Sequence, residues 1–289
     1  MIFDGSKKCD ECGHLNFYDA VFCNDCGAKL PNVCVFCGHV NDPDADFCIS
    51  CGALLKKAVE ELTHNLERAT SSGQDAKRFI DLAYDANMAG RYDEGRQYGF
   101  NAALLEPDNY LAYCNQAFSL LRSGRAENAA ALYRKAAEME PTDHITFTML
   151  GQALTSLGQY TEAIDLFRKV SEMAPDYAEN YDSWGFCLCD MGNNNAALPL
   201  LEKALELDPE LPTVYPNLAH ALYYTGKTEE ALGIAEKGYQ TVMTDEIKGW
   251  VDFLKKELAA AEEQKMKDFK PPEKKDEKET AEGTEEDFD

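Results

Sequence analysis

The sequence predicts an all-α protein whose main body is an α-solenoid, a row of stacked helix–turn–helix units behind a small cysteine-rich front. Prolines recur every 34 residues, at Pro107, Pro141, Pro175 and Pro209. Glycines recur with the same period, at Gly90, Gly124, Gly158, Gly192 and Gly226. A fixed period of this length is typical of solenoids, because one unit cannot bury its own apolar face and neighbouring units must stack to do so.

Each unit carries the pattern of two amphipathic helices. In the most complete copy, Phe147, Leu150 and Leu154 fall on one helical face, and Ala163 and Phe167 fall on the face of the next helix. The glycine between the two helices can adopt positive φ, and the proline ends the second helix. A small residue in the first helix lets the paired helices approach closely, at Ala117, Gly151, Gly185 and Ala219.

This pattern resembles the tetratricopeptide repeat, a helix–turn–helix unit of the same length. The resemblance implies five units over residues 76–245, at about 76–109, 110–143, 144–177, 178–211 and 212–245. A further amphipathic helix at 246–263 is expected to cap the array, since the last unit of a solenoid needs a polar outer face. The charged segment 264–289 holds too few apolar residues to fold and is expected to be a disordered tail.

Residues 1–54 form a separate module with four Cys-x-x-Cys pairs, each followed by glycine. The pairs are Cys9 and Cys12, Cys23 and Cys26, Cys34 and Cys37, and Cys48 and Cys51. The second four cysteines repeat the first four after 25 residues. Four thiolates from two such pairs form a tetrahedral set that suits zinc, and a module this small needs a metal to fold. The pattern resembles the double zinc ribbon, and two structural Zn²⁺ ions are expected.

Other readings of the cysteines stay open. Iron could occupy such a site, and Cys23, Cys26, Cys34 and Cys37 could share one metal in place of sequential pairing. A disulfide framework would need an oxidising compartment, which nothing in the sequence indicates. Four cysteine ligands leave no open position for catalysis. Residues 55–75 have a helical apolar face followed by a Ser-Ser-Gly break, which predicts a linker helix and a hinge.

The charge of the chain argues against nucleic acid as a partner. The formal net charge is −24, and with eight cysteines as thiolates on two zinc ions it becomes about −28. A phosphate backbone would be repelled by this field, whereas a basic protein surface would be attracted. No apolar run is long enough to insert into a membrane. The stretch from Met1 to Cys9 lacks an apolar signal core, so a cytoplasmic location is expected.

The resemblance to tetratricopeptide repeats implies that first-helix side chains line a concave groove that binds a protein segment. The matching positions are Ile80, Tyr84, Met88, Cys114, Phe118, Thr148, Gln152, Asp182, Phe186, His220 and Tyr223, flanked by Asn115 and Asn217. Only Asn115 matches the lysine and asparagine clamp that holds acidic chaperone tails, so no such clamp is expected. An aromatic and mildly acidic groove favours a protein partner with apolar anchors and basic flanks.

No catalytic residue is predicted, because no nucleophile, base and orienting group cluster at a recognisable spacing. Gly226, Lys227 and Thr228 resemble the end of a phosphate loop, but Ala221 replaces the required glycine and an inter-helix turn is expected. The sequence therefore favours a non-enzymatic interaction scaffold without a small-molecule substrate, in which the zinc ribbons add a second contact module. The alternatives are a nucleic-acid- or ribosome-associated zinc-ribbon factor and a redox or enzymatic protein.

Overall fold

A computed structural model of the chain describes residues 6–8, 15–17, 32–33, 40–41, 48 and 75–268. Residues 75–268 form eleven helices: α2 (Ala76–Met88), α3 (Tyr92–Leu105), α4 (Tyr110–Arg122), α5 (Ala126–Met139), α6 (His144–Ser156), α7 (Tyr160–Met173), α8 (Ala178–Asp190), α9 (Asn194–Leu207), α10 (Val214–Tyr224), α11 (Thr228–Val242) and α12 (Asp245–Asp268). The described strands are β1 (Ser6–Lys8), β2 (Leu15–Phe17), β3 (Asn32–Val33) and β4 (Val40–Asn41). The predicted linker at 55–75 lies outside the described residues except for Asp75, which caps α2. Of the predicted disordered tail at 264–289, residues 264–268 instead continue helix α12, and residues 269–289 lie outside the described residues.

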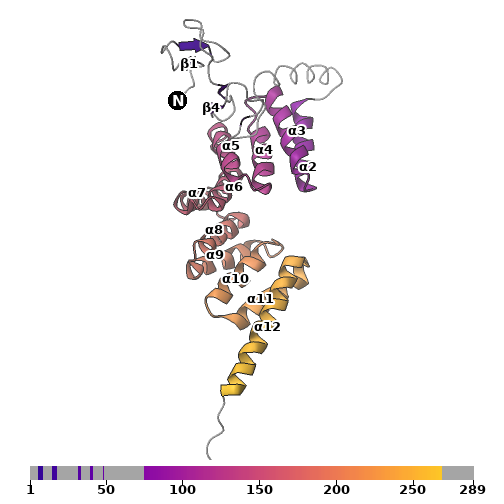
Figure 1. Cartoon of the computed structure of the whole chain (residues 1–289), viewed down its shortest axis with the longest axis vertical. Coiled ribbons are helices and arrows are strands. Elements are labelled where there is room, and N and C mark those ends of the chain that lie inside the picture. The colour runs from indigo at the N-terminus through magenta and orange to yellow at the C-terminus, as the bar shows by residue number, and fades with distance from the viewer. Residues whose placement is uncertain are drawn as a thin grey trace, which may run out of the picture.

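The helices form five antiparallel pairs, from α2 with α3 to α10 with α11, and the pairs stack in chain order (Figure 1). Each first helix also packs against the first helix of the next unit, so α2, α4, α6, α8 and α10 lie side by side. Helix α12 packs on α10 and α11 and then extends past the array (Figure 1). The predicted fold class, an all-α tetratricopeptide solenoid, is confirmed. No described helix combines a membrane-spanning length with sufficient apolarity.

The turn between the two helices of a unit has the same geometry each time. Its glycine has φ between 70° and 85°, at Gly90, Gly124, Gly158, Gly192 and Gly226. The residue after the glycine donates its backbone N–H to the carbonyl five residues earlier, as Lys227 does to Leu222 at 2.9 Å. This is a Schellman motif, whose left-handed position suits glycine because glycine has no Cβ. The prediction of positive φ at these glycines is confirmed.

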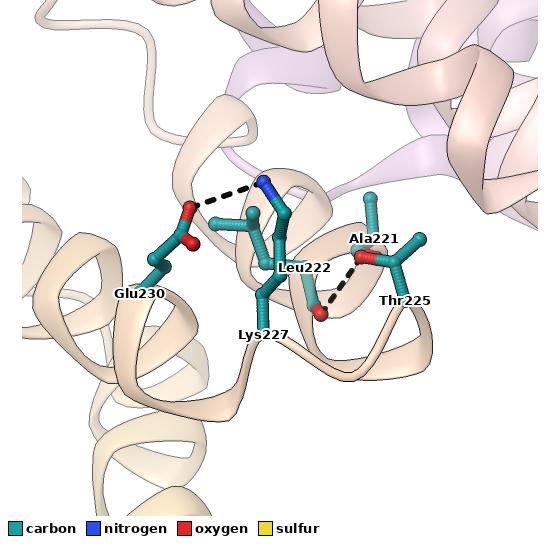
Figure 2. A network of polar contacts seen from close by, with 5 residues as sticks. All are labelled: Ala221, Leu222, Thr225, Lys227 and Glu230. Atoms are coloured by element: carbon teal, nitrogen blue, oxygen red, sulfur yellow. Dashed lines mark hydrogen bonds and ion pairs between the residues drawn. The ribbon is translucent and has the colours of Figure 1, made fainter.

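Figure 2 shows the last of these turns, between α10 and α11. Thr225 Oγ1 donates a hydrogen bond to the carbonyl oxygen of Leu222 at 3.0 Å. Lys227 Nζ lies 3.3 Å from Glu230 Oε2, so the lysine forms an ion pair inside its own unit. The segment that resembles a phosphate loop is therefore an inter-helix turn, as predicted.

Small residues set how closely the two helices of a unit approach. A Cβ placed on Gly151 would lie 2.5 Å from the ring of Phe167, and one on Gly185 would lie 2.5 Å from Leu201 Cγ. Ala117 and Ala219 stand at the equivalent places and are fully buried. The predicted close approach at these positions is confirmed, and there is no room for a larger side chain without a shift of the second helix.

The unit proline has a further role, because its carbonyl oxygen accepts a hydrogen bond from a tyrosine of the following unit. The donor–acceptor distances are 2.8 Å for Tyr113 to Pro107, 3.1 Å for Tyr181 to Pro175 and 2.7 Å for Tyr215 to Pro209. Lysines of the second helices lie over rings of the first, namely Lys135 over Tyr113, Lys169 over Phe147 and Lys203 over Tyr181. Each contact ties the ring to its unit by a polar bond or a cation–π interaction.

The buried core runs through the array in two large clusters that share bridging residues. One cluster centres on α2–α7 and the other on α8–α12, and Ile164 and Trp184 pack against both. At the far end Ile247 and Leu254 of α12 are fully buried, so this helix covers the apolar face that α10 and α11 would otherwise expose. This is the end piece that a solenoid requires.

Replacing Gly151 with alanine should lower the free energy of unfolding by about 1–3 kcal/mol, because the new methyl group overlaps the Phe167 ring. Gly233 is the matched control, since it is an exposed helical glycine of α11 with no neighbouring atom within 4 Å of a Cβ. Gly233→Ala should raise stability by about 0.5–1 kcal/mol through helix propensity. Urea unfolding followed by circular dichroism measures both, and a tolerated Gly151→Ala would contradict the close packing.

Candidate functional site

The first helices and the start of α12 line a groove made of two adjoining hollows of about 430 Å³ and 290 Å³. The lining residues come from four first helices and from α12. They include Phe118, Leu121 and Arg122 of α4, Gln152 of α6, Asp182, Phe186 and Asp190 of α8, Thr213 just before α10, Pro216, Asn217 and His220 of α10, and Glu246 and Trp250 of α12. The two hollows share Phe186, Pro216, Asn217 and Glu246. They therefore form one continuous surface, hereafter the groove.

The structure brings together only part of the predicted set. Six predicted residues line the groove: Phe118, Gln152, Asp182, Phe186, Asn217 and His220. The other seven predicted positions lie outside both hollows: Ile80, Tyr84, Met88, Cys114, Asn115, Thr148 and Tyr223. Tyr84 and Met88 are each 57% exposed on α2, whereas Ile80 packs against the core. The groove thus extends from α4 to α12, and no described residue of the first unit lines it.

Hydrogen bonds between successive first helices occupy several of the predicted side chains. They join Asn87 Nδ2 to the Asn115 carbonyl at 3.1 Å, Cys114 Sγ to Thr146 Oγ1 at 3.2 Å, Thr148 Oγ1 to Asn180 Oδ1 at 3.3 Å, and Gln152 Nε2 to Ser183 Oγ at 2.7 Å. We call this set the polar ladder. Because its members bond each other across about 30 positions of sequence, they fix the spacing of the units and are not free to bind a partner fully.

Asp182, another predicted groove residue, accepts two side-chain hydrogen bonds from the next unit. One carboxylate oxygen accepts a hydrogen bond from Thr213 Oγ1 at 2.6 Å, and the other accepts one from Asn217 Nδ2 at 2.8 Å. The residue is only 6% exposed, and its burial raises the pKa of the carboxyl although both hydrogen bonds act in the opposite direction. Asp182 therefore acts as a brace between α8 and α10 at the floor of the groove.

Burial also shifts the pKa of two other predicted groove residues, Cys114 and His220. Burial raises the pKa of the Cys114 thiol to about 12, so this sulfur is a poor nucleophile near neutral pH. Burial lowers the pKa of His220, so its imidazole is neutral near pH 7. Neither residue is poised for catalysis, because Cys114 bonds to a threonine and His220 contacts aromatic rings.

An aromatic cluster closes the groove at its α12 end. The His220 ring centroid lies 4.5 Å from that of Tyr224 and 5.9 Å from that of Trp250, and the latter pair meets at 83°. Phe253 lies 5.7 Å from Trp250 and 5.1 Å from Tyr223. Tyr223 also donates its hydroxyl to Glu257 at 3.2 Å, so it supports the cluster from outside the groove.

Transfer of the repeat's unit positions missed several residues that line the groove, among them Leu121, Arg122, Thr213, Pro216, Glu246 and Trp250. Leu121 and Arg122 stand three and four residues after Phe118, on the same helical face, and this spacing could have indicated them. Glu246 and Trp250 belong to α12, which has no counterpart in the repeats. Their four-residue spacing places them on one face, but the sequence does not show that this face turns toward the groove.

The described parts of the cysteine-rich module fit zinc ribbons. Strands β1 and β2 pair antiparallel with Lys8 opposite Leu15, and β3 and β4 pair with Val33 opposite Val40. In each module the first Cys-x-x-Cys pair falls in the connection between two paired strands, which suits a metal-binding knuckle. Cys48 is 1% exposed and belongs to the buried cluster of α2–α7. The other seven predicted ligands lie outside the described residues.

Comparison with protein families agrees with both parts. The double zinc ribbon family model matches residues 9–52, and two tetratricopeptide repeat models match residues 120–183 and 187–232. The chain contains tetratricopeptide repeats and a double zinc ribbon. Tetratricopeptide folds typically serve as non-enzymatic protein-interaction scaffolds, and this chain has the architecture of one. None of the curated proteins compared with it gives a match.

Solved structures with the same architecture are similar in fold. TTC0263, a thermophilic tetratricopeptide protein of Thermus thermophilus, is 19% identical with a TM-score of 0.58, over 62% of this chain and 98% of that one. The APC/C hetero-tetramer Cut9–Hcn1 contains a chain that is 16% identical with a TM-score of 0.59, over 68% of this chain and 39% of that one. At these identities the likeness concerns the fold alone.

Replacing Asp182 with asparagine should keep both hydrogen bonds, because the amide oxygen accepts from Asn217 and the amide nitrogen donates to Thr213. The raised pKa means that the folded chain holds a proton more tightly than the unfolded chain. The carboxyl thus contributes less to the free energy of unfolding as pH rises from about 4 toward 7. The stability of Asp182→Asn relative to the parent should therefore increase over this range, as pH-dependent thermal melts would show. A pH-independent difference would contradict the assignment.

Replacing Cys48 with serine should lower the metal content from about two zinc ions per chain to about one, because one of the two four-cysteine sets loses a ligand. Cys114→Ser is the matched control and should keep both ions, since Cys114 bonds to Thr146. Inductively coupled plasma mass spectrometry of the purified chains reads zinc and iron together. Iron in the parent chain, or an unchanged zinc content in Cys48→Ser, would contradict the zinc-ribbon assignment.

Proposed function

We propose that the chain is a scaffold that holds a segment of a partner protein in the groove, with the zinc ribbons as a second contact module. The observation that carries the proposal is the continuous groove along α4 to α12, whose aromatic lining includes the exposed side chain of Phe186. Large apolar side chains left exposed on one face of a protein commonly serve contact with another protein.

Apolar anchors of the partner would contact the middle of the groove. Phe186 is 46% exposed there, and it lines both hollows together with Pro216. Phe118 is half-buried and is supported by an edge contact with Tyr92, with ring centroids 6.5 Å apart. Held aromatic rings lose little conformational freedom on binding, which is why such rings often dominate interface energies.

The charges of the groove support a partner with basic flanks. Asp190 and Glu246 lie at the α12 end, whereas Arg122 lies at the α4 end and bonds to the Tyr92 hydroxyl at 3.4 Å. The net charge of −24 extends the negative field beyond the groove. Such a field speeds the approach of a basic segment and repels a phosphate backbone.

The zinc ribbons would hold two structural zinc ions through their eight cysteines, and each ion would supply the folding energy of its module. The burial of Cys48 in the cluster of α2–α7 supports a contact between the second ribbon and the helices. Two contact modules on one chain raise avidity when both reach the same partner.

Replacing Phe118 and Phe186 together with alanine should lower partner capture by about tenfold or more, because both apolar contacts of the groove are lost. Affinity capture from native lysate with nuclease present, quantified by mass spectrometry, compares this double variant with the parent. Tyr239→Ala is the matched control, since Tyr239 is 40% exposed on α11 and does not line the groove.

The expected result is a set of proteins that is retained by Tyr239→Ala and lost by the double variant, while circular dichroism stays unchanged. Tyr84→Ala should retain the set too, because Tyr84 lies outside the groove. Full retention by the double variant would overturn the groove proposal. Capture that disappears only with nuclease treatment would instead favour a nucleic-acid-associated factor.

A further inference from the structure

The smaller hollow, at the α12 end of the groove, combines aromatic walls with carboxylates. Its volume is about 290 Å³, and Phe186, His220 and Trp250 line it together with Asp190 and Glu246. It lies between α8, α10 and the start of α12, next to the aromatic cluster described above. We call it the α12 pocket.

Two rings of the α12 pocket form a corner. His220 and Trp250 have ring centroids 5.9 Å apart and an interplanar angle of 83°, so their faces are nearly perpendicular. Trp250 also makes an edge contact with Phe253, with ring centroids 5.7 Å apart. Aromatic faces carry negative partial charge and attract cations placed over them. A corner of supported rings is therefore a ready contact surface for a flat cationic group.

The carboxylates of the α12 pocket add a formal negative charge to this surface. One oxygen of Asp190 accepts a hydrogen bond from the Tyr160 hydroxyl at 2.9 Å, which orients the carboxylate. Within residues 75–268, the Glu246 carboxylate has no ion-pair or hydrogen-bond partner. No described lysine or arginine lines the pocket, and burial keeps the pKa of His220 below its ordinary value. The pocket thus presents negative charge that no neighbouring cation balances.

We propose that the α12 pocket binds an arginine side chain of the partner segment. The guanidinium group would stack on the indole of Trp250 and donate hydrogen bonds to Glu246 and Asp190. Arginine suits this site better than lysine because its group is planar, weakly hydrated and able to donate two parallel hydrogen bonds to one carboxylate. The inference rests on the proposed function, since the arginine belongs to the segment that occupies the groove.

The position of the α12 pocket places the arginine next to the apolar anchor of the segment. The pocket shares Phe186, Pro216 and Asn217 with the larger hollow, which continues to Phe118 and Arg122. A segment whose apolar residue contacts Phe186 would reach the pocket with its next basic residue. The cation of Arg122 at the opposite end favours an acidic or neutral residue there. The groove therefore favours a partner with an arginine close in sequence to its apolar anchor.

The test uses the full chain labelled with ¹⁵N and a small probe, N-acetyl-arginine amide. The chain holds two tryptophans, so each indole N–H signal is assignable by substitution. Trp250 lines the pocket, whereas Trp184 packs in the core and serves as the internal reference. The expected result is a saturable shift of the Trp250 signal with a constant Trp184 signal. N-acetyl-citrulline amide, which is neutral and of the same shape, should bind about fivefold or more weakly.

Charge-neutralising variants distinguish binding in the α12 pocket from attraction by the net negative charge of the chain. Glu246→Gln and Asp190→Asn should each weaken binding of the arginine probe by about threefold or more, because each removes one charged acceptor. Glu202→Gln is the matched control: Glu202 is an exposed residue of α9 away from the groove, so the probe affinity should stay unchanged. Equal weakening by all three variants would mean long-range attraction only and would overturn the proposal.

Other outcomes are equally decisive. Equal binding of the arginine and citrulline probes, or of a lysine probe and the arginine probe, would overturn the assignment of arginine. If the Trp250 signal does not move while capture still depends on Phe118 and Phe186, then the pocket proposal fails and the scaffold proposal stands. If capture is also unaffected by those phenylalanines, then the scaffold proposal fails as well.

Discussion

The structure depends on one constraint, namely that a pair of short helices can bury its apolar face only against the next pair. The constraint appears as the close fit of small to large residues, for example Gly185 against Leu201. It also requires that both ends of the array be covered. Helix α12 covers one end with Ile247 and Leu254, and Cys48 of the cysteine-rich module is buried in the cluster of α2–α7.

The same stacking decides which side chains remain available for a partner. First helices lie side by side, so polar groups on their shared face bond to each other before they meet solvent. Asp182 and Gln152 illustrate this, because both are held by residues of the next unit. Phe186 instead projects from the stack and stays exposed. In the proposed function, recognition would therefore depend on aromatic rings and on carboxylates outside the polar ladder, such as Glu246.

The sequence predicts the repeats well because each unit specifies its own helix ends, turn and close contact. The positive φ of Gly226 and the tight approach at Gly151 follow from residue type alone. The groove is less predictable, because the position of a residue in its unit fixes the helix face on which it lies but not the partners of its hydrogen bonds. The unit position predicts that Asp182 lines the groove, as it does, but not that its carboxylate also braces α8 against α10. Trp250 belongs to a helix outside the period, so no repeat position indicates it.

The central claim is that a partner segment lies along the groove at α8. Site-specific incorporation of a photo-crosslinking phenylalanine analogue at Phe186, compared with Tyr239 on α11, measures this contact directly in cell lysate. The account predicts a crosslinked protein at position 186, with the contact peptide carrying an apolar residue, and no such product at position 239. Equal products at both positions, or a product at position 239 alone, would contradict it.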